Sequence, residues 1–118
     1  MKRTKFIMTY KRGDIVLVRV VFSEGTGTKK RPALIISDEY YNSKRQEIII
    51  AAITSNIKWV LPGDTKIQEW NKAGLKHPSL LTTIIQTIQE YMIDRRLGKL
   101  SSSDFLEYQS NLKKCLGF

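Results

Sequence analysis

Three short runs of β-branched and other apolar residues fill the first half of the chain and leave few architectures open. They span residues 15–22, 31–37 and 47–55, and polar segments separate them. Runs of this length and composition predict strands. In the first run, odd and even positions are both mostly apolar, which predicts a strand that is covered on both faces of its sheet. The third run is the most apolar of the three.

The second half of the chain predicts fewer strands and longer loops. Residues 79–88 are rich in β-branched residues and predict a strand, with a bulge left open. Residues 97–100 predict a short strand. Residues 38–46 predict a polar loop, and residues 56–76 predict a long loop with at most a short strand near residues 65–68.

The chain ends with the pattern of an amphipathic helix. Ser101 and Asp104 have the spacing of a capping box, and Gly117 supplies a stop. Strands followed by one helix, without alternation of the two, predict a mainly β (α+β) fold: a small antiparallel barrel or bent sheet closed by a C-terminal helix. Four residues share the apolar face of this helix at helical spacing: Phe105, Tyr108, Leu112 and Leu116.

Length and charge limit the kind of protein. The 118 residues predict one domain, at 11–118, preceded by a basic arm at 1–10. The net charge of +9 is concentrated in residues 1–45 and favours a polyanionic partner, with nucleic acid ahead of an anionic membrane. A single cysteine, Cys115, and the lack of a long apolar run predict a cytoplasmic protein.

A candidate site follows from the spacing of the second and third strands. If residues 31–37 and 47–55 pair as a hairpin, the numbers of facing residues add to about 85. Arg31 then faces the hydroxyls of Thr54 and Ser55. Pro32, expected at the start of its strand, holds Arg31 in an extended conformation. A fixed guanidinium beside a hydroxyl suits phosphate recognition; alternatively, Arg31 and Pro32 only protect an aggregation-prone strand.

Other chemistries find little support in the sequence. His77 is the only histidine, which excludes a pair of catalytic imidazoles, and its Lys76-His77-Pro78 setting predicts a surface loop. The acidic residues are scattered, which argues against a carboxylate site for two metal ions. We therefore expect no metal and no cofactor, and a nuclease built on this chain would depend on arginine.

Several short motifs resemble a known family. They read KRGDIV at 11–16, KRPALIIS at 30–37, IAAITS at 50–55, AGL at 73–75, PS at 78–79 and LGKLS at 97–101. In this order and spacing they resemble the MazF/PemK toxins of bacterial type II toxin–antitoxin systems, from about Lys11 to the C-terminus. The resemblance implies an SH3-like barrel with a C-terminal helix, a homodimer, and a cognate antitoxin whose acidic or apolar tail covers the basic groove.

The resemblance also implies an activity. Members of this family inhibit growth as metal-independent endoribonucleases that cut single-stranded RNA or mRNA at short sequences and leave a cyclic phosphate and a 5′-hydroxyl. By motif, the catalytic residues fall on Arg31 and Thr54. Arg31 is expected to stabilise charge on the phosphoryl oxygens, with assistance to the leaving oxygen as a further role, and Thr54 to orient the reacting groups. We expect RNA contacts from Lys29, Lys30, Ser55, Gly25, Gly27, Glu24 and Lys58.

Two alternatives stay open at this stage. The same barrel can bind RNA without cutting it. It can also serve a gyrase poison of the CcdB type, although Leu116-Gly117-Phe118 reverses the order of residues that those toxins carry at their C-terminus.

Overall fold

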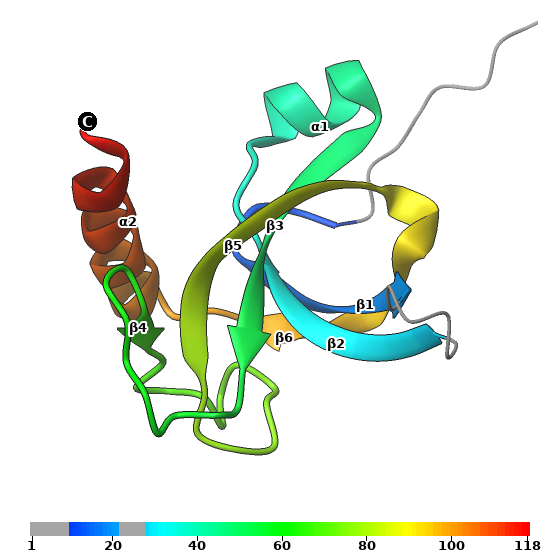
Figure 1. The fold of residues 1–118 in the computed structure, drawn as a ribbon. Helices are drawn as coiled ribbons and strands as arrows, with labels where there is room; N and C mark the ends of the chain where they lie inside the picture. Colours follow the sequence, from blue (N-terminus) through cyan, green and yellow to red (C-terminus); the bar gives the residue numbers. More distant parts are fainter. Residues whose placement is uncertain (1–9, 22–27) are drawn as a thin grey trace, which may run out of the picture.

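The computed structural model describes residues 10–21 and 28–118 (Figure 1). In this part of the chain, six strands form one antiparallel sheet in the order β4-β5-β3-β2-β1-β6. The elements are β1 (Asp14–Val21), β2 (Thr28–Ile35), α1 (Glu39–Arg45), β3 (Glu47–Thr54), β4 (Thr65–Lys66), β5 (Leu80–Gln89), η1 (Glu90–Met92), β6 (Ile93–Lys99) and α2 (Ser102–Leu116). The predicted architecture of an antiparallel sheet followed by a helix is confirmed.

The sheet curves strongly and buries residues on both faces (Figure 1). Ile15 and Leu34 belong to the core cluster that includes Tyr108 of α2. Their chain neighbours Val16 and Ala33 belong to a second cluster. Successive residues of a strand point to opposite faces of the sheet. A strand between two cores therefore needs apolar residues at both odd and even positions, as found in residues 15–22.

The pairing of β2 with β3 has the predicted register. Ala33 faces Ala52 and Ile35 faces Ile50, as the hairpin numbering requires. The expected start of β2 is wrong, because the strand begins at Thr28 and Pro32 lies in its interior. β1 pairs with β2 from Thr28 to Leu34, so the polar start of the strand is held by its neighbour.

A short helix replaces the loop predicted for residues 38–46. Asp38 caps α1, and its carboxylate accepts from the backbone N–H of Tyr40 at 2.9 Å. Asn42 is fully buried, and its side chain hydrogen-bonds both the hydroxyl and the carbonyl of Ser37. A buried asparagine that ties the helix to the end of β2 leaves no apolar periodicity in the sequence, which is why the helix was missed.

The strand predicted at 79–88 is β5, and it contains an irregularity. Ala51 faces Ile85 while Ile53 faces Leu81, so extra residues of β5 oppose Ala52. The Thr82 hydroxyl fills this gap, donating to the carbonyl of Ala52 at 2.8 Å and accepting from the N–H of Ile84 at 3.1 Å. The bulge left open by the sequence is therefore present.

The last strand is longer than predicted. β6 begins at Ile93, whereas the sequence indicated a strand only over 97–100. After the buried Ile93, Asp94, Arg95 and Arg96 follow in succession and are half-buried or exposed. This part of β6 is polar because the strand lies at an edge of the sheet and pairs with β1 alone among the described strands. An exposed edge strand carries little hydrophobic signal.

Helix α2 packs through a narrower face than predicted. Ser101 caps it by accepting from the N–H of Asp104 at 3.1 Å, and Gly117 ends it at φ +80°. The buried Asp104 carboxylate accepts from the N–H groups of Gln68 and Glu69, fastening the loop after β4. Leu116, predicted on the apolar face, is exposed. None of the helices in the described residues is long and apolar enough to cross a membrane.

Candidate active site

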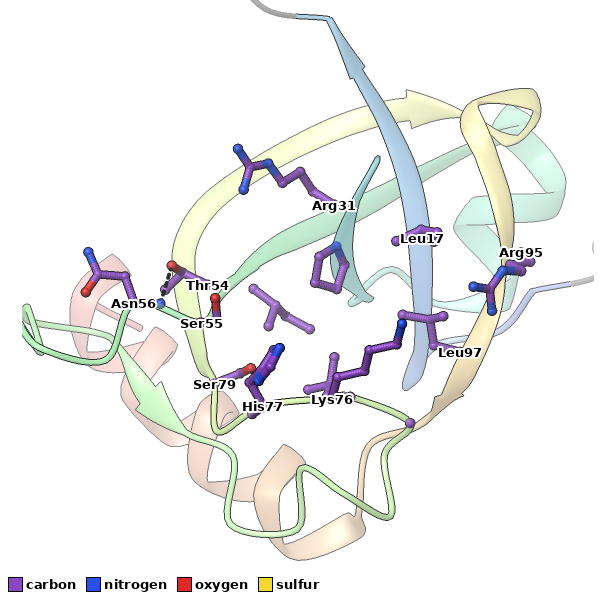
Figure 2. A pocket seen from close by; sticks show the side chains of 14 residues that line it. Leu17, Arg31, Thr54, Ser55, Asn56, Lys76, His77, Ser79, Arg95 and Leu97 are labelled. Atoms are coloured by element: carbon purple, nitrogen blue, oxygen red, sulfur yellow. Dashed lines mark hydrogen bonds between the residues drawn. The ribbon is translucent and has the colours of Figure 1, made fainter. Parts of the chain in front are cut away.

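A cavity of about 420 Å³ opens where β2 and β3 separate (Figure 2). The pairing of these strands ends at Ala33 and Ala52, and the same register continued outward sets Arg31 opposite Thr54. Both side chains line the cavity. The two residues that the sequence set side by side thus share one concave surface.

The cavity draws its walls from segments far apart in the chain. Strands β1, β2 and β6 form one side, and the end of β3 with the loop before β5 forms the other (Figure 2). The lining residues are Leu17, Arg31, Pro32, Ile53, Thr54, Ser55, Asn56, Gly74, Leu75, Lys76, His77, Ser79, Arg95 and Leu97.

Arg31 is presented by a constrained backbone. Its Cα partner in β1 is Val18, and Pro32 follows it. Proline restricts the preceding residue to extended conformations. Beyond Ala33 the strand has no pairing with β3, so a residue without an N–H is tolerated at position 32. The side-chain torsions of Arg31 alone therefore decide where its guanidinium points.

Thr54 is the last residue of β3 and is half-buried. Its backbone pairs with Leu80 of β5, and its hydroxyl oxygen accepts from the N–H of Asn56 at 3.1 Å (Figure 2). A hydroxyl that accepts one hydrogen bond still has its own proton to donate. Ser55 adds a second hydroxyl to the lining.

Asp94 gathers three basic side chains beside the cavity. Its carboxylate lies 3.3 Å from the Nζ of Lys30, 3.3 Å from an Nη of Arg19 and 3.8 Å from the Nε of Arg95. The hydrogen bond from Lys30, together with the charges of Lys30 and Arg19, lowers the pKa of Asp94 below its ordinary value. Exposed ion pairs contribute little to stability, so the main effect is to orient these cations.

The charge of the cavity suits an anion. The charged side chains in its described lining are Arg31, Lys76 and Arg95, and no carboxylate lies among them. Residues 10–21 and 28–118 contain no group of three His, Cys, Asp or Glu side chains that could hold a metal ion. Arginine and hydroxyl donors in a concave site fit the oxygens of a phosphodiester.

A protein-family comparison agrees with this geometry. The family model that matches is described as a PemK-like, MazF-like toxin of a type II toxin–antitoxin system, and the match covers residues 11–116. The chain belongs to this family. No curated protein sequence matches the chain.

Solved structures of MazF-type toxins have the same fold. A MazE–MazF complex from Deinococcus radiodurans superposes with a TM-score of 0.77 at 18% identity, covering 94% of this chain and 99% of that one. An endoribonuclease from a mycobacterial species gives 0.75 at 15%, covering 96% of each chain. The Mycobacterium tuberculosis toxin MazF-mt6 gives 0.73 at 21%, covering 89% and 97%. The chain therefore has the MazF fold.

The other residues that the sequence indicated as RNA contacts lie in different places. Ser55 lines the cavity with Arg31 and Thr54. Lys29 and Lys30 are exposed on β2, outside the lining. Lys58 is exposed in the loop after β3, outside the lining, and its N–H donates to the side chain of Asn56 at 3.3 Å. Glu24, Gly25 and Gly27 lie outside the described residues.

Three lining residues with ionisable side chains were not selected as site residues from the sequence. Lys76 and His77 come from the loop before β5, and Arg95 comes from β6 (Figure 2). His77 is exposed in a loop, as predicted, and it also lines the cavity. Both segments reach the site through contacts distant in sequence. The motifs at 73–75 and 97–101 flank them and were the only signal.

Proposed function

We propose that this chain is an endoribonuclease that cuts single-stranded RNA and acts as the toxin of a type II toxin–antitoxin system. The observation that carries the proposal is the meeting of Arg31 and Thr54 in one cation-lined cavity of a chain that belongs to the MazF/PemK family. Several structural neighbours support it, because they are named endoribonucleases or MazF toxins.

The reaction we infer is an attack by the ribose on its own phosphate. The 2′-hydroxyl oxygen bonds to phosphorus, and the bond from phosphorus to the 5′-oxygen breaks. The products are a 2′,3′-cyclic phosphate and a 5′-hydroxyl. Arg31 stabilises the negative charge that builds on the phosphoryl oxygens, since a permanently protonated guanidinium favours this role over proton transfer. Thr54 orients the reacting groups through its hydroxyl proton.

The proposal includes partners and conditions. The enzyme works without a metal ion, as a homodimer in the cytoplasm, at a short RNA sequence. A cognate antitoxin inhibits it by laying an acidic or apolar segment over the basic cavity. In support, two neighbouring structures are MazE–MazF complexes, and one is an endoribonuclease with its cognate antitoxin.

Incubation of the purified protein with a long single-stranded RNA in EDTA, with mapping of the new ends, tests this function. We expect discrete cuts with 5′-hydroxyl ends. Arg31→Ala and Thr54→Ala should each lower the rate by about 10²–10³-fold, as expected for the loss of a group that stabilises the transition state. Lys72→Ala serves as a control, because Lys72 is exposed and lies outside the cavity.

The outcomes separate the candidates. Cutting that persists at the parent rate in both variants would contradict the site. RNA binding by the parent without cutting would contradict the activity and favour an RNA-binding module.

A further inference from the structure

The proposed reaction requires a proton donor for the 5′-oxygen as it leaves. An effective general acid exchanges its proton near the working pH. Arginine stays protonated in proteins and is poorly suited to this task, whereas imidazole is the side chain best suited to it. His77 carries an imidazole in the same cavity as Arg31. We propose that His77 is the general acid of the reaction, an inference that rests on the proposed function.

The loop that carries His77 is fastened on both sides. Before it, Leu75 is buried in the core, and its N–H donates to the carbonyl of Trp70 at 3.1 Å. After it, the buried Ser79 donates its hydroxyl to the carbonyl of His77 at 2.8 Å. Pro78 restricts His77 to extended conformations. These contacts hold the backbone of His77 at the wall of the cavity.

His77 and Arg31 occupy different walls of the cavity. Figure 2 shows His77 on the loop before β5 and Arg31 on the strand across the opening, with Thr54 and Ser55 at one side. In an in-line displacement, the attacking and leaving oxygens lie on opposite sides of phosphorus. A phosphate that contacts Arg31 through its non-bridging oxygens can thus turn its 5′-oxygen toward a second wall.

The proton balance of the step is simple. As the 2′-oxygen bonds to phosphorus, its proton passes to water. As the bond to the 5′-oxygen breaks, the imidazolium of His77 gives that oxygen a proton and becomes neutral imidazole. Water then returns a proton to His77, so each turnover restores the enzyme.

Replacement of the leaving oxygen by sulfur tests the assignment. The probes are two oligoribonucleotides that carry the mapped cleavage sequence, one natural and one with sulfur in place of the scissile 5′-oxygen. A thiolate leaves without protonation, so the sulfur probe does not need a general acid. His77→Gln should slow cutting of the natural probe by about 10²–10⁴-fold. It should cut the sulfur probe at close to the parent rate.

Two controls make the result specific. Arg31→Ala should slow both probes, because charge builds on the phosphoryl oxygens in either case, and Lys72→Ala should slow neither. Equal losses on both probes for His77→Gln would overturn the role as acid, as would an unchanged rate on the natural probe. If the parent protein cuts neither probe, the proposed function itself fails.

Discussion

At the scale of single residues, the candidate site depends on a cation whose charge does not change with pH. Arg31 follows two lysines, yet Arg31 is the member of that run that lines the cavity. A guanidinium presents several N–H donors in a fixed plane and can contact two phosphate oxygens at once, whereas an ammonium acts as a point charge. Because Pro32 restricts its backbone, Arg31 would begin the proposed reaction partly aligned.

Tyr108 of α2 hydrogen-bonds the helix to the sheet. Its hydroxyl donates to the carbonyl of Thr82 at 2.8 Å, and burial raises the pKa of Tyr108 to about 12. An unfolded tyrosine loses its proton near pH ~10. The protonated Tyr108 hydroxyl therefore contributes its full stabilisation of the folded state below about pH 10, and this contribution is lost as the pH rises toward 12.

We predict that Tyr108→Phe lowers the free energy of unfolding by about 1 kcal/mol at neutral pH, the usual contribution of such a hydrogen bond. The difference from the parent should narrow between pH ~10 and the folded pKa of about 12. Urea unfolding at a series of pH values measures it. Tyr91→Phe is the matched control, since Tyr91 is 77% exposed. A difference that stays constant over this range would contradict the assignment.

The sequence revealed some residues of the cavity and concealed others. Arg31 and Thr54 were accessible because both follow from one strand register and short motifs. His77 and Arg95 were not, because the loop before β5 and the strand β6 meet the cavity through packing that no local pattern records. In the sequence, a histidine followed by proline looks the same whether its loop lies in open solvent or lines a functional site.

At the scale of elements, the packing of one loop against β6 sets the second wall of the cavity. Gly74 has φ +91°, and a Cβ there would lie 2.2 Å from the carbonyl oxygen of Leu97. Gly98 meets Ala73 in the same close approach, where a Cβ would lie 2.3 Å from the carbonyl oxygen. Two glycines thus let the backbones touch and bring Lys76 and His77 to the site.

We predict that Gly74→Ala lowers the free energy of unfolding by about 3 kcal/mol, since it adds an overpacked contact to the cost of a left-handed alanine. Gly117→Ala is the matched control: its φ is +80°, but nothing lies within 4 Å of an added Cβ. It should cost only the left-handed conformation of alanine, about 1–2 kcal/mol. Urea denaturation compares the two, and equal losses would show that the contact with Leu97 has no energetic role.

The elements differ in how far the sequence revealed them. Helix α2 was predictable from its caps, Ser101 and Gly117, and from its apolar face. Helix α1 buries an asparagine, and only its N-cap Asp38 indicates a helix in the sequence. β6 was underestimated because Asp94, Arg95 and Arg96 belong to an edge strand, whose pairing with β1 is a tertiary fact. The alternation of buried and exposed residues can be recognised in the sequence, but the pairing of one strand with another cannot.

At the scale of the whole molecule, charge and fold point to the same ligand. The chain carries a net charge of +9, and its cavity is lined by cations. Such a surface attracts any nucleic acid through phosphate contacts, which carry no sequence information. What distinguishes a ribonuclease from a general polyanion binder is use of the 2′-hydroxyl, the group that separates RNA from DNA.

The most direct measurement therefore removes that one group. An oligoribonucleotide with the mapped cleavage sequence is compared with a copy that carries a single 2′-deoxy residue on the 5′ side of the scissile phosphate. The account predicts that both bind with similar affinity in EDTA, that the natural strand is cut to a cyclic phosphate and a 5′-hydroxyl, and that the deoxy strand is not cut at that position. Cutting of the deoxy strand at the same phosphate would contradict attack by the 2′-hydroxyl and with it the mechanism assigned to Arg31 and Thr54.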